Sequence, residues 1–146
     1  YLLIGKPVYT WNLRGLQLIK WAGQEVVPPG KHTLEFDFKY DGLGAATLQY
    51  GSPSGLGRSG TGYLKVDGKV VATQKMEKTV PMLMQWCESF DVGADTGSPV
   101  ADDDYQPPFR FTGKLEKLTL TIDRPELSEE DIQKLQAAMH NNPAAE

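Results

Sequence analysis

The clearest alternation in the sequence is His32-Thr33-Leu34-Glu35-Phe36-Asp37-Phe38-Lys39-Tyr40. Its even-numbered positions hold His, Leu, Phe and Tyr residues, whereas its odd-numbered positions hold polar or charged residues. This period of two predicts a half-buried strand of an antiparallel sheet, because a strand buried on both faces would be apolar throughout. Pro28-Pro29-Gly30 before the stretch and Asp41-Gly42 after it mark its ends.

Similar alternation occurs elsewhere in the chain. Leu64 and Val66 lie before Asp67-Gly68 and Val70 lies after it, which indicates a two-residue hairpin. The other strand candidates are residues 8–13, 16–21, 45–50, 80–90, 109–111 and 118–122. About eight or nine short strands with no helix between them favour a sandwich or a barrel over a βαβ arrangement. We therefore predict an all-β fold over residues 1–125, an antiparallel β-sandwich of the jelly-roll type.

A helix is expected only at the C-terminus, within residues 126–146. Ser128 can cap it, with Asp131 three residues on as a capping-box variant, and Leu127 and Ile132 occupy hydrophobic-staple positions. The apolar stripe of this helix consists of Ile132, Leu135 and Met139. We expect one C-terminal α-helix that belongs to the same domain, with a frayed tail over residues 141–146.

Length and composition limit the class of protein. The 146 residues match one average domain, and a hydrophobic content of 40% is enough to build a core. The apolar runs fall well short of the roughly 18 residues that span a bilayer, so we expect no membrane partner. The net charge of −4 argues against a nucleic-acid partner. Because the chain starts at Tyr1 rather than Met, we expect it to be part of a longer polypeptide.

The negative charge is concentrated in one segment. Residues 79–109 hold six of the nineteen acidic residues and none of the fifteen lysines and arginines. Hard oxygen ligands on a Gly-bearing loop suit calcium, which makes Asp91 and Asp95 calcium candidates, although the spacing is not that of an EF-hand. We favour the alternative in which these two carboxylates accept backbone N–H bonds in Asx turns. The run 102–104 is interpreted as a solvated corner.

One glycine-rich stretch, Gly55-Leu56-Gly57-Arg58-Ser59-Gly60, fits the dinucleotide-binding pattern G-x-G-x-x-G. That fingerprint needs a strand before it and a helix after it, whereas Ser52-Pro53-Ser54 precede it and a predicted strand follows. We therefore interpret the stretch as a loop. Arg58 in this loop could hold an anion, although a single arginine is more often simply solvated.

Candidates for catalysis are few. His32 falls on the apolar face of its strand, where a hydrogen-bonded core or rim histidine is the default, and His140 lies near a helix end. Cys87 is the only cysteine, which excludes an internal disulfide, and a buried inert thiol fits its place beside Trp86 better than a nucleophile. No Ser-His-Asp or Cys-His arrangement is indicated.

The aromatic residues suggest carbohydrate binding as an alternative function. Six of them lie on or next to predicted strands and could stack on sugar rings: Trp11, Trp21, Tyr40, Tyr50, Tyr63 and Trp86. A sugar-binding platform needs such residues to be exposed together. Core filling is the interpretation that we favour.

Four elements of the sequence carry a resemblance to a known family. They are YLLIGKPVY at 1–9, GKHTLEFDFKYDG at 30–42, GTGYLKVDGK at 60–69, and FDVGADTGSPV with Tyr105 at 90–105. In this order they resemble recurring elements in the C-terminal region of bacterial arylsulfatases, over roughly residues 1–125. The C-terminal helix is not covered by the resemblance.

The resemblance implies a limited role. Sulfatases hydrolyse sulfate esters with a formylglycine made in a C/S-x-P-x-R motif beside a divalent metal, and both belong to a large N-terminal α/β domain. Cys87 is followed by Glu88-Ser89-Phe90, and S-x-P-x-R is absent, so no catalytic or metal-binding residue carries over to this chain. The resemblance therefore implies a non-catalytic domain without its own cofactor. It favours a periplasmic or secreted parent protein, although the sequence does not identify the compartment.

We therefore predict a C-terminal accessory domain of an arylsulfatase-type sulfuric ester hydrolase. Its partner would be the catalytic domain of the same parent polypeptide, whose substrate cleft it could help to wall. Long ordered loops are often functional, so we assign contacts to the Gly-rich loop, residues 51–62, and to the acidic loop, residues 91–105. The candidate interface or ligand residues are Arg58, Ser59, Thr61, Asp91, Asp95, Thr96 and Tyr105. The alternative is a stand-alone carbohydrate-binding β-sandwich module.

Overall fold

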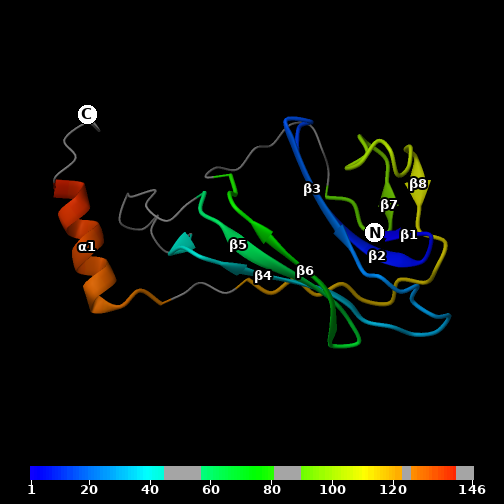
Figure 1. The fold of residues 1–146 in the computed structure, drawn as a ribbon, viewed down its shortest axis with the longest axis horizontal. Coiled ribbons are helices and arrows are strands. Elements are labelled where there is room, and N and C mark those ends of the chain that lie inside the picture. The colour runs from blue at the N-terminus through cyan, green and yellow to red at the C-terminus, as the bar shows by residue number, and fades with distance from the viewer. Residues whose placement is uncertain (45–56, 81–89, 123–125, 141–146) are drawn as a thin grey trace. The chain divides into compact units, whose positions relative to one another are not determined.

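The computed structural model of the chain describes residues 1–44, 57–80, 90–122 and 126–140 (Figure 1). This part of the chain contains eight strands and one helix. In chain order they are β1 (Leu2–Leu3), β2 (Lys6–Leu13), β3 (Gln17–Ala22), β4 (Leu34–Tyr40), β5 (Gly60–Val66), β6 (Lys69–Met76), β7 (Ala94–Asp95), β8 (Phe109–Arg110) and α1 (Glu129–His140).

The described strands form three sheets, with the orders β1–β2–β3, β4–β5–β6 and β7–β8. Strand pairs in the first and third sheets are antiparallel. The prediction of an all-β, antiparallel fold with one C-terminal helix is confirmed, and the sheets are consistent with a sandwich-like fold.

The chain divides into two compact units. Unit 1 comprises Tyr1–Asp37, Gly62–Gln74 and Met84–Leu120, and unit 2 comprises Phe38–Thr61, Lys75–Leu83 and Thr121–Glu146. The acidic loop therefore belongs to unit 1, whereas α1 belongs to unit 2.

Three aromatic rings pack together where two sheets meet in unit 1: Trp21 is buried, Tyr9 is half-buried and Phe36 is 37% exposed. Tyr9 of β2 and Trp21 of β3 are opposite each other in the sheet, and Phe36 of β4 stacks on Tyr9 with ring centroids 3.7 Å apart. Gly62 of β5 lies against the same rings, since a Cβ atom there would lie only 2.5 Å from Cζ2 of Trp21. Two sheets thus meet through these rings, and Trp21 is only 7% exposed, as core filling requires.

The predicted hairpin between β5 and β6 is confirmed. Asp67 and Gly68 both have positive φ angles, +50° and +80°, which two-residue turns of type I′ require. Asp67 also binds the two residues just before β4: its Oδ2 lies 2.7 Å from Nδ1 of His32, and its Oδ1 accepts the N–H of Thr33 at 2.8 Å. The hydrogen bonds from His32 and Thr33 lower the pKa of Asp67.

His32 is half-buried and hydrogen-bonded, as the sequence predicts for a rim histidine. Its other ring nitrogen, Nε2, is buried and has no hydrogen-bond partner among the described residues. The ring therefore fastens the hairpin turn through Nδ1 alone, which is a structural role.

Helix α1 begins as its sequence predicts. Oγ of Ser128 accepts the N–H of Asp131 at 3.2 Å, and the Asp131 carboxylate accepts the N–H of Ser128 at 3.4 Å, so the capping box is formed. The hydrogen bonds from Ser128 lower the pKa of Asp131. Leu135 of the predicted stripe is buried and Ile132 is half-buried.

Two strand predictions need correction, and two lie outside the described residues. Residues 118–122 form no strand, and their large apolar side chains are exposed. Alternation shows which face of a segment is apolar, but a strand also needs a neighbour to bond, and no described strand pairs with this segment. The acidic loop, which the sequence indicates as a loop between strands, contains the two-residue strand β7. Residues 45–50 and 81–89 lie outside the described part.

Candidate functional site

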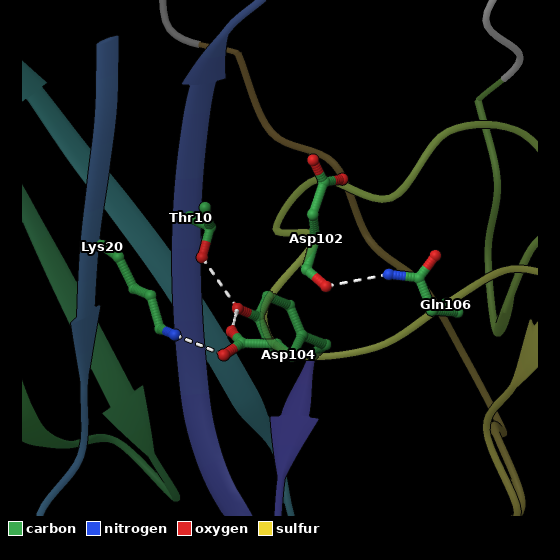
Figure 2. A network of polar contacts seen from close by, with 6 residues as sticks. Thr10, Lys20, Asp102, Asp104 and Gln106 are labelled. Carbon is green, nitrogen blue, oxygen red and sulfur yellow. Dashed lines mark hydrogen bonds and ion pairs between the residues drawn. The ribbon is translucent and has the colours of Figure 1, made fainter. Parts of the chain in front are cut away.

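The acidic turn 102–104 is fastened to the first sheet by Asp104 (Figure 2). Nζ of Lys20, on β3, lies 2.5 Å from Oδ1 of Asp104, and the Tyr1 hydroxyl donates to Oδ2 of the same carboxylate. The Tyr1 hydroxyl is also within 2.9 Å of Oγ1 of Thr10 on β2. The Asp104 side chain is only 7% exposed, so the prediction of a solvated corner is wrong for this residue.

The electrostatics of this network follow from the ion pair. The hydrogen bond from the Lys20 ammonium, and after it the one from Tyr1, lower the pKa of Asp104. Burial, followed by the hydrogen bond to Asp104, raises the pKa of Tyr1 to about 12. At neutral pH the network therefore contains an ionised carboxylate and a protonated phenol, which is the pairing that gives a strong hydrogen bond.

The start of the acidic loop is held by its own aspartates. Oδ1 of Asp95 accepts the N–H of Gly97 at 3.2 Å, which forms the predicted Asx turn. Asp91 bonds instead to Thr96, whose N–H and hydroxyl donate to Oδ2 at 3.0 and 3.1 Å. Tyr105 closes the loop, because its hydroxyl donates to Oδ2 of Asp95 at 2.5 Å.

Tyr105 also accepts the N–H of Val100 at 3.1 Å, so its hydroxyl is fully engaged inside the loop. Burial and the hydrogen bond to Asp95 raise the pKa of Tyr105. These contacts account for the loop's shape through protein groups. Among the described residues no group of three acidic, His or Cys side chains is placed to hold a metal ion.

The described end of the Gly-rich loop, in unit 2, is held by Asp41. The Ser59 hydroxyl donates to Oδ2 of Asp41 at 2.5 Å, and the Lys75 ammonium binds the same oxygen. These two contacts, with Lys75 the larger, lower the pKa of Asp41. The Arg58 N–H donates to the Tyr40 hydroxyl at 2.9 Å, while the Arg58 side chain is exposed.

The seven predicted site residues thus fall into two groups. Asp91, Asp95, Thr96 and Tyr105 come together in the acidic loop of unit 1. The other group consists of Arg58, Ser59 and Thr61, which lie at and just before the start of β5 in unit 2. Residues 51–56 of the Gly-rich loop lie outside the described part.

Lys20, Tyr1 and Thr10 were missed by sequence reasoning. Lys20 pairs with a residue 84 positions away, and Tyr1 with one 103 positions away. Such contacts depend on how strands are brought together and leave no local pattern in the sequence. The one sequence signal for such a contact is the lack of any lysine or arginine in residues 79–109, which leaves their acids to pair with a base from elsewhere in the chain.

The aromatic residues do not form a flat platform in the described part. Trp21 is in the core, and Trp11, Tyr40 and Tyr63 are half-buried, whereas Tyr50 and Trp86 lie outside the described residues. A row that sequence reasoning did not select does exist: Tyr1, Tyr105 and Phe109 follow one another with ring centroids 5.6 and 5.1 Å apart. The rings are inclined by 59° and 44°, so they present no common plane.

Comparisons with family models, curated proteins and solved structures find no match to this chain. The helix in the described residues is neither long nor apolar enough to span a bilayer.

Proposed function

We propose that the chain is a non-catalytic accessory domain of an arylsulfatase-type sulfuric ester hydrolase. It would pack on a catalytic α/β domain of the same parent polypeptide and help to wall that domain's substrate cleft. The proposal starts from the resemblance of residues 1–125 to the C-terminal region of this family. Loops that are held in one shape by internal contacts are what such a role requires.

The observation that best supports the proposal is how the resembling elements bond to one another. His32 of the element at 30–42 binds Asp67 of the element at 60–69, at 2.7 Å. Within the element at 90–105, Tyr105 binds Asp95 and Thr96 binds Asp91. The side chains that carry the resemblance are therefore engaged in fastening turns and loops. Such a role suits a supporting domain better than a reaction centre.

The exposed apolar side chains agree with a domain that has a partner. Leu118, Leu120 and Ile122 are each more than half exposed. Large apolar side chains that stay in water in a folded protein mark interaction sites when several of them occur together. A catalytic domain of the parent would remove part of this surface from water.

The first test is to read the coding sequence upstream of Tyr1. An in-frame C/S-x-P-x-R motif in a predicted α/β region is expected. The second arm assays aryl sulfate hydrolysis by this chain alone and by the longer polypeptide. We expect turnover only in the longer polypeptide, and turnover by this chain alone would contradict the proposal.

The stand-alone carbohydrate-binding module is the weaker alternative. Its best support is the row Tyr1, Tyr105 and Phe109, but inclined rings cannot all stack on one flat sugar chain. Calorimetric titration with polysaccharides separates the two proposals. Saturable heat that is lost in Phe109→Ala would favour the carbohydrate module.

Calcium at Asp91 and Asp95 can be tested through stability. An ion bound only by the folded protein must raise its melting temperature. We expect thermal melts with calcium and with a chelator to coincide, because both carboxylates already accept hydrogen bonds from the loop. A higher melting temperature with calcium than with the chelator would support a calcium site at Asp91 and Asp95.

A further inference from the structure

The turn between β1 and β2 carries an isoleucine in an unfavourable backbone conformation. Ile4 and Gly5 form this turn, with φ angles of +50° and +75°. They connect Leu3 and Lys6, which are paired across the two strands. Positive φ angles at both central residues are what a type I′ turn requires, and Asn-Gly is its preferred sequence. Glycine adopts such angles freely, but a β-branched residue does so rarely, so the backbone disfavours isoleucine at the first position.

The same side chain is almost completely in water. Ile4 is 89% exposed, the highest fraction among the large apolar side chains that the structure describes. A single exposed apolar residue is ordinary in a folded protein and by itself indicates nothing. At this position two costs coincide, because asparagine would relieve the backbone strain and would also be better solvated. Residues that break local rules in this way are expected at functional sites.

The turn is held in place by the segment that follows β3. The N–H of Val27 donates to the carbonyl of Gly5 at 2.9 Å. Val26 packs against the same glycine, since a Cβ atom at Gly5 would lie only 2.7 Å from Cγ1 of Val26. Strained residues persist only where surrounding contacts over-determine the backbone. Ile4 is therefore presented in a fixed backbone conformation at the tip of the turn.

The shape of the turn limits what can cover Ile4, which protrudes beside the 56% exposed Val26. A protruding tip encloses no small molecule, because ligand sites are concave. The tips of two copies of the chain would meet over far less than the roughly 800 Å² per partner that stable protein interfaces bury. Two apolar side chains are also a small anchor for a bilayer, since even a whole myristoyl chain binds only marginally. The surface that fits Ile4 is an apolar pocket on another protein region.

We propose that Ile4, with Val26 beside it, inserts into an apolar pocket of the catalytic α/β domain on which this chain packs. The inference rests on the proposed function for the existence of that domain, and it adds the residue that anchors the contact. Burial removes the apolar area of Ile4 from water and so offsets the strain and the exposure that the free chain tolerates. Because the turn is already held in shape, little further ordering is needed on binding.

The first measurement is the thermal melt of this chain alone with Ile4→Asn. Asparagine is preferred at this position of a type I′ turn, so the melting temperature should rise by about 2–4 °C. The matched control for the binding experiment is Arg14→Asn. Arg14 has a φ angle of +49° and precedes Gly15 in the turn between β2 and β3, so this variant changes the same kind of position elsewhere. An unchanged or lower melting temperature in Ile4→Asn would overturn the inference, because the strain on which it rests would be absent.

The second measurement is isothermal titration with the catalytic α/β region that the proposed function expects upstream, expressed separately. Ile4→Asn should weaken the association about tenfold or more, because a polar side chain replaces the apolar anchor. Arg14→Asn should leave the affinity unchanged. A more stable chain that forms a weaker complex is the result that the inference predicts, since a residue with a purely structural role would be needed for the stability of the chain itself. An equal loss of affinity in both variants would overturn the inference.

Other occupants of the tip give different results. A dimer of the wild type in sedimentation that Ile4→Asn abolishes would assign Ile4 to a contact between copies and overturn the inference. Flotation of the wild type, but not of Ile4→Asn, with phosphatidylcholine vesicles would assign Ile4 to a membrane and also overturn it.

The titration also separates the inference from the proposed function. If the folded catalytic region binds the wild type and Ile4→Asn with equal affinity, the inference fails and the proposed function stands. If that region binds neither protein, both fail.

Discussion

In the aromatic core, the rings of Tyr9, Trp21 and Phe36 hold two sheets together by direct contact. In the acidic loop, carboxylates hold the chain through hydroxyls, backbone N–H groups and a lysine. Both regions belong to unit 1, yet the first depends on removing apolar area from water and the second on charge. We therefore expect the core to set the stability of the unit and the loop to set its response to pH.

The largest effect is expected from Trp21→Ala. Removing a buried Trp side chain loses its transfer free energy and leaves a cavity, so the free energy of unfolding should fall by about 3–5 kcal/mol. Urea denaturation measures this change. Leu18→Ala, at an exposed position of the same strand, is the control and should change stability by less than about 0.5 kcal/mol. Equal effects of the two substitutions would mean that Trp21 is not central to the core.

Gly62→Ala tests the close contact between the sheets. The added methyl group would lie 2.5 Å from Cζ2 of Trp21 and 3.0 Å from the ring of Phe36. Overpacking of this kind costs about 1–3 kcal/mol. In the same denaturation assay, combining Gly62→Ala with Trp21→Ala should recover part of the loss, because the indole that clashes is gone. If the stability losses of the two single variants simply add in the double variant, the close contact between Gly62 and the Trp21 ring is contradicted.

In the acidic loop, Tyr105→Phe should cost about 0.5–1.5 kcal/mol for each of two hydrogen bonds. The change removes the donor to Asp95 and the acceptor of the Val100 N–H but keeps the ring. Tyr9→Phe is the matched control, since the Tyr9 hydroxyl forms no hydrogen bond with the described residues. A larger loss of stability in Tyr9→Phe than in Tyr105→Phe would contradict the structural role of the Tyr105 hydroxyl.

The smallest effect concerns the ion pair of Asp104. Because the folded-state pKa of Asp104 lies below its ordinary value of 3.8, its contribution is present above that pH and is lost as the pH falls further. Stability measured between neutral pH and about pH 3 should therefore fall less steeply in Lys20→Met than in the wild type. Trp21→Ala should lower stability without changing that slope. Identical slopes for the wild type and Lys20→Met would exclude the ion pair as a source of acid sensitivity.

How far the sequence predicts the structure differs between the same two regions. Alternation around Phe36 and the Asp67-Gly68 signal are local, so β4 and the hairpin follow from them. The same rule failed for residues 118–122, because pairing with a neighbour is not a local property. The composition shows that the acidic segment has acids and no bases of its own. It does not show that Lys20 and Tyr1 bind Asp104.

The central claim is the proposal that this chain supports a catalytic domain of the same parent polypeptide. It is tested most directly by isothermal titration of this chain with the catalytic α/β region that the proposal expects upstream, expressed separately. We predict saturable one-to-one binding that Leu120→Ser, at a position 74% exposed in this chain, weakens and that the α1 pair Glu129→Gln with Glu130→Gln does not weaken. An absence of binding between the two folded proteins, or an equal affinity of Leu120→Ser and the wild type, would contradict the account.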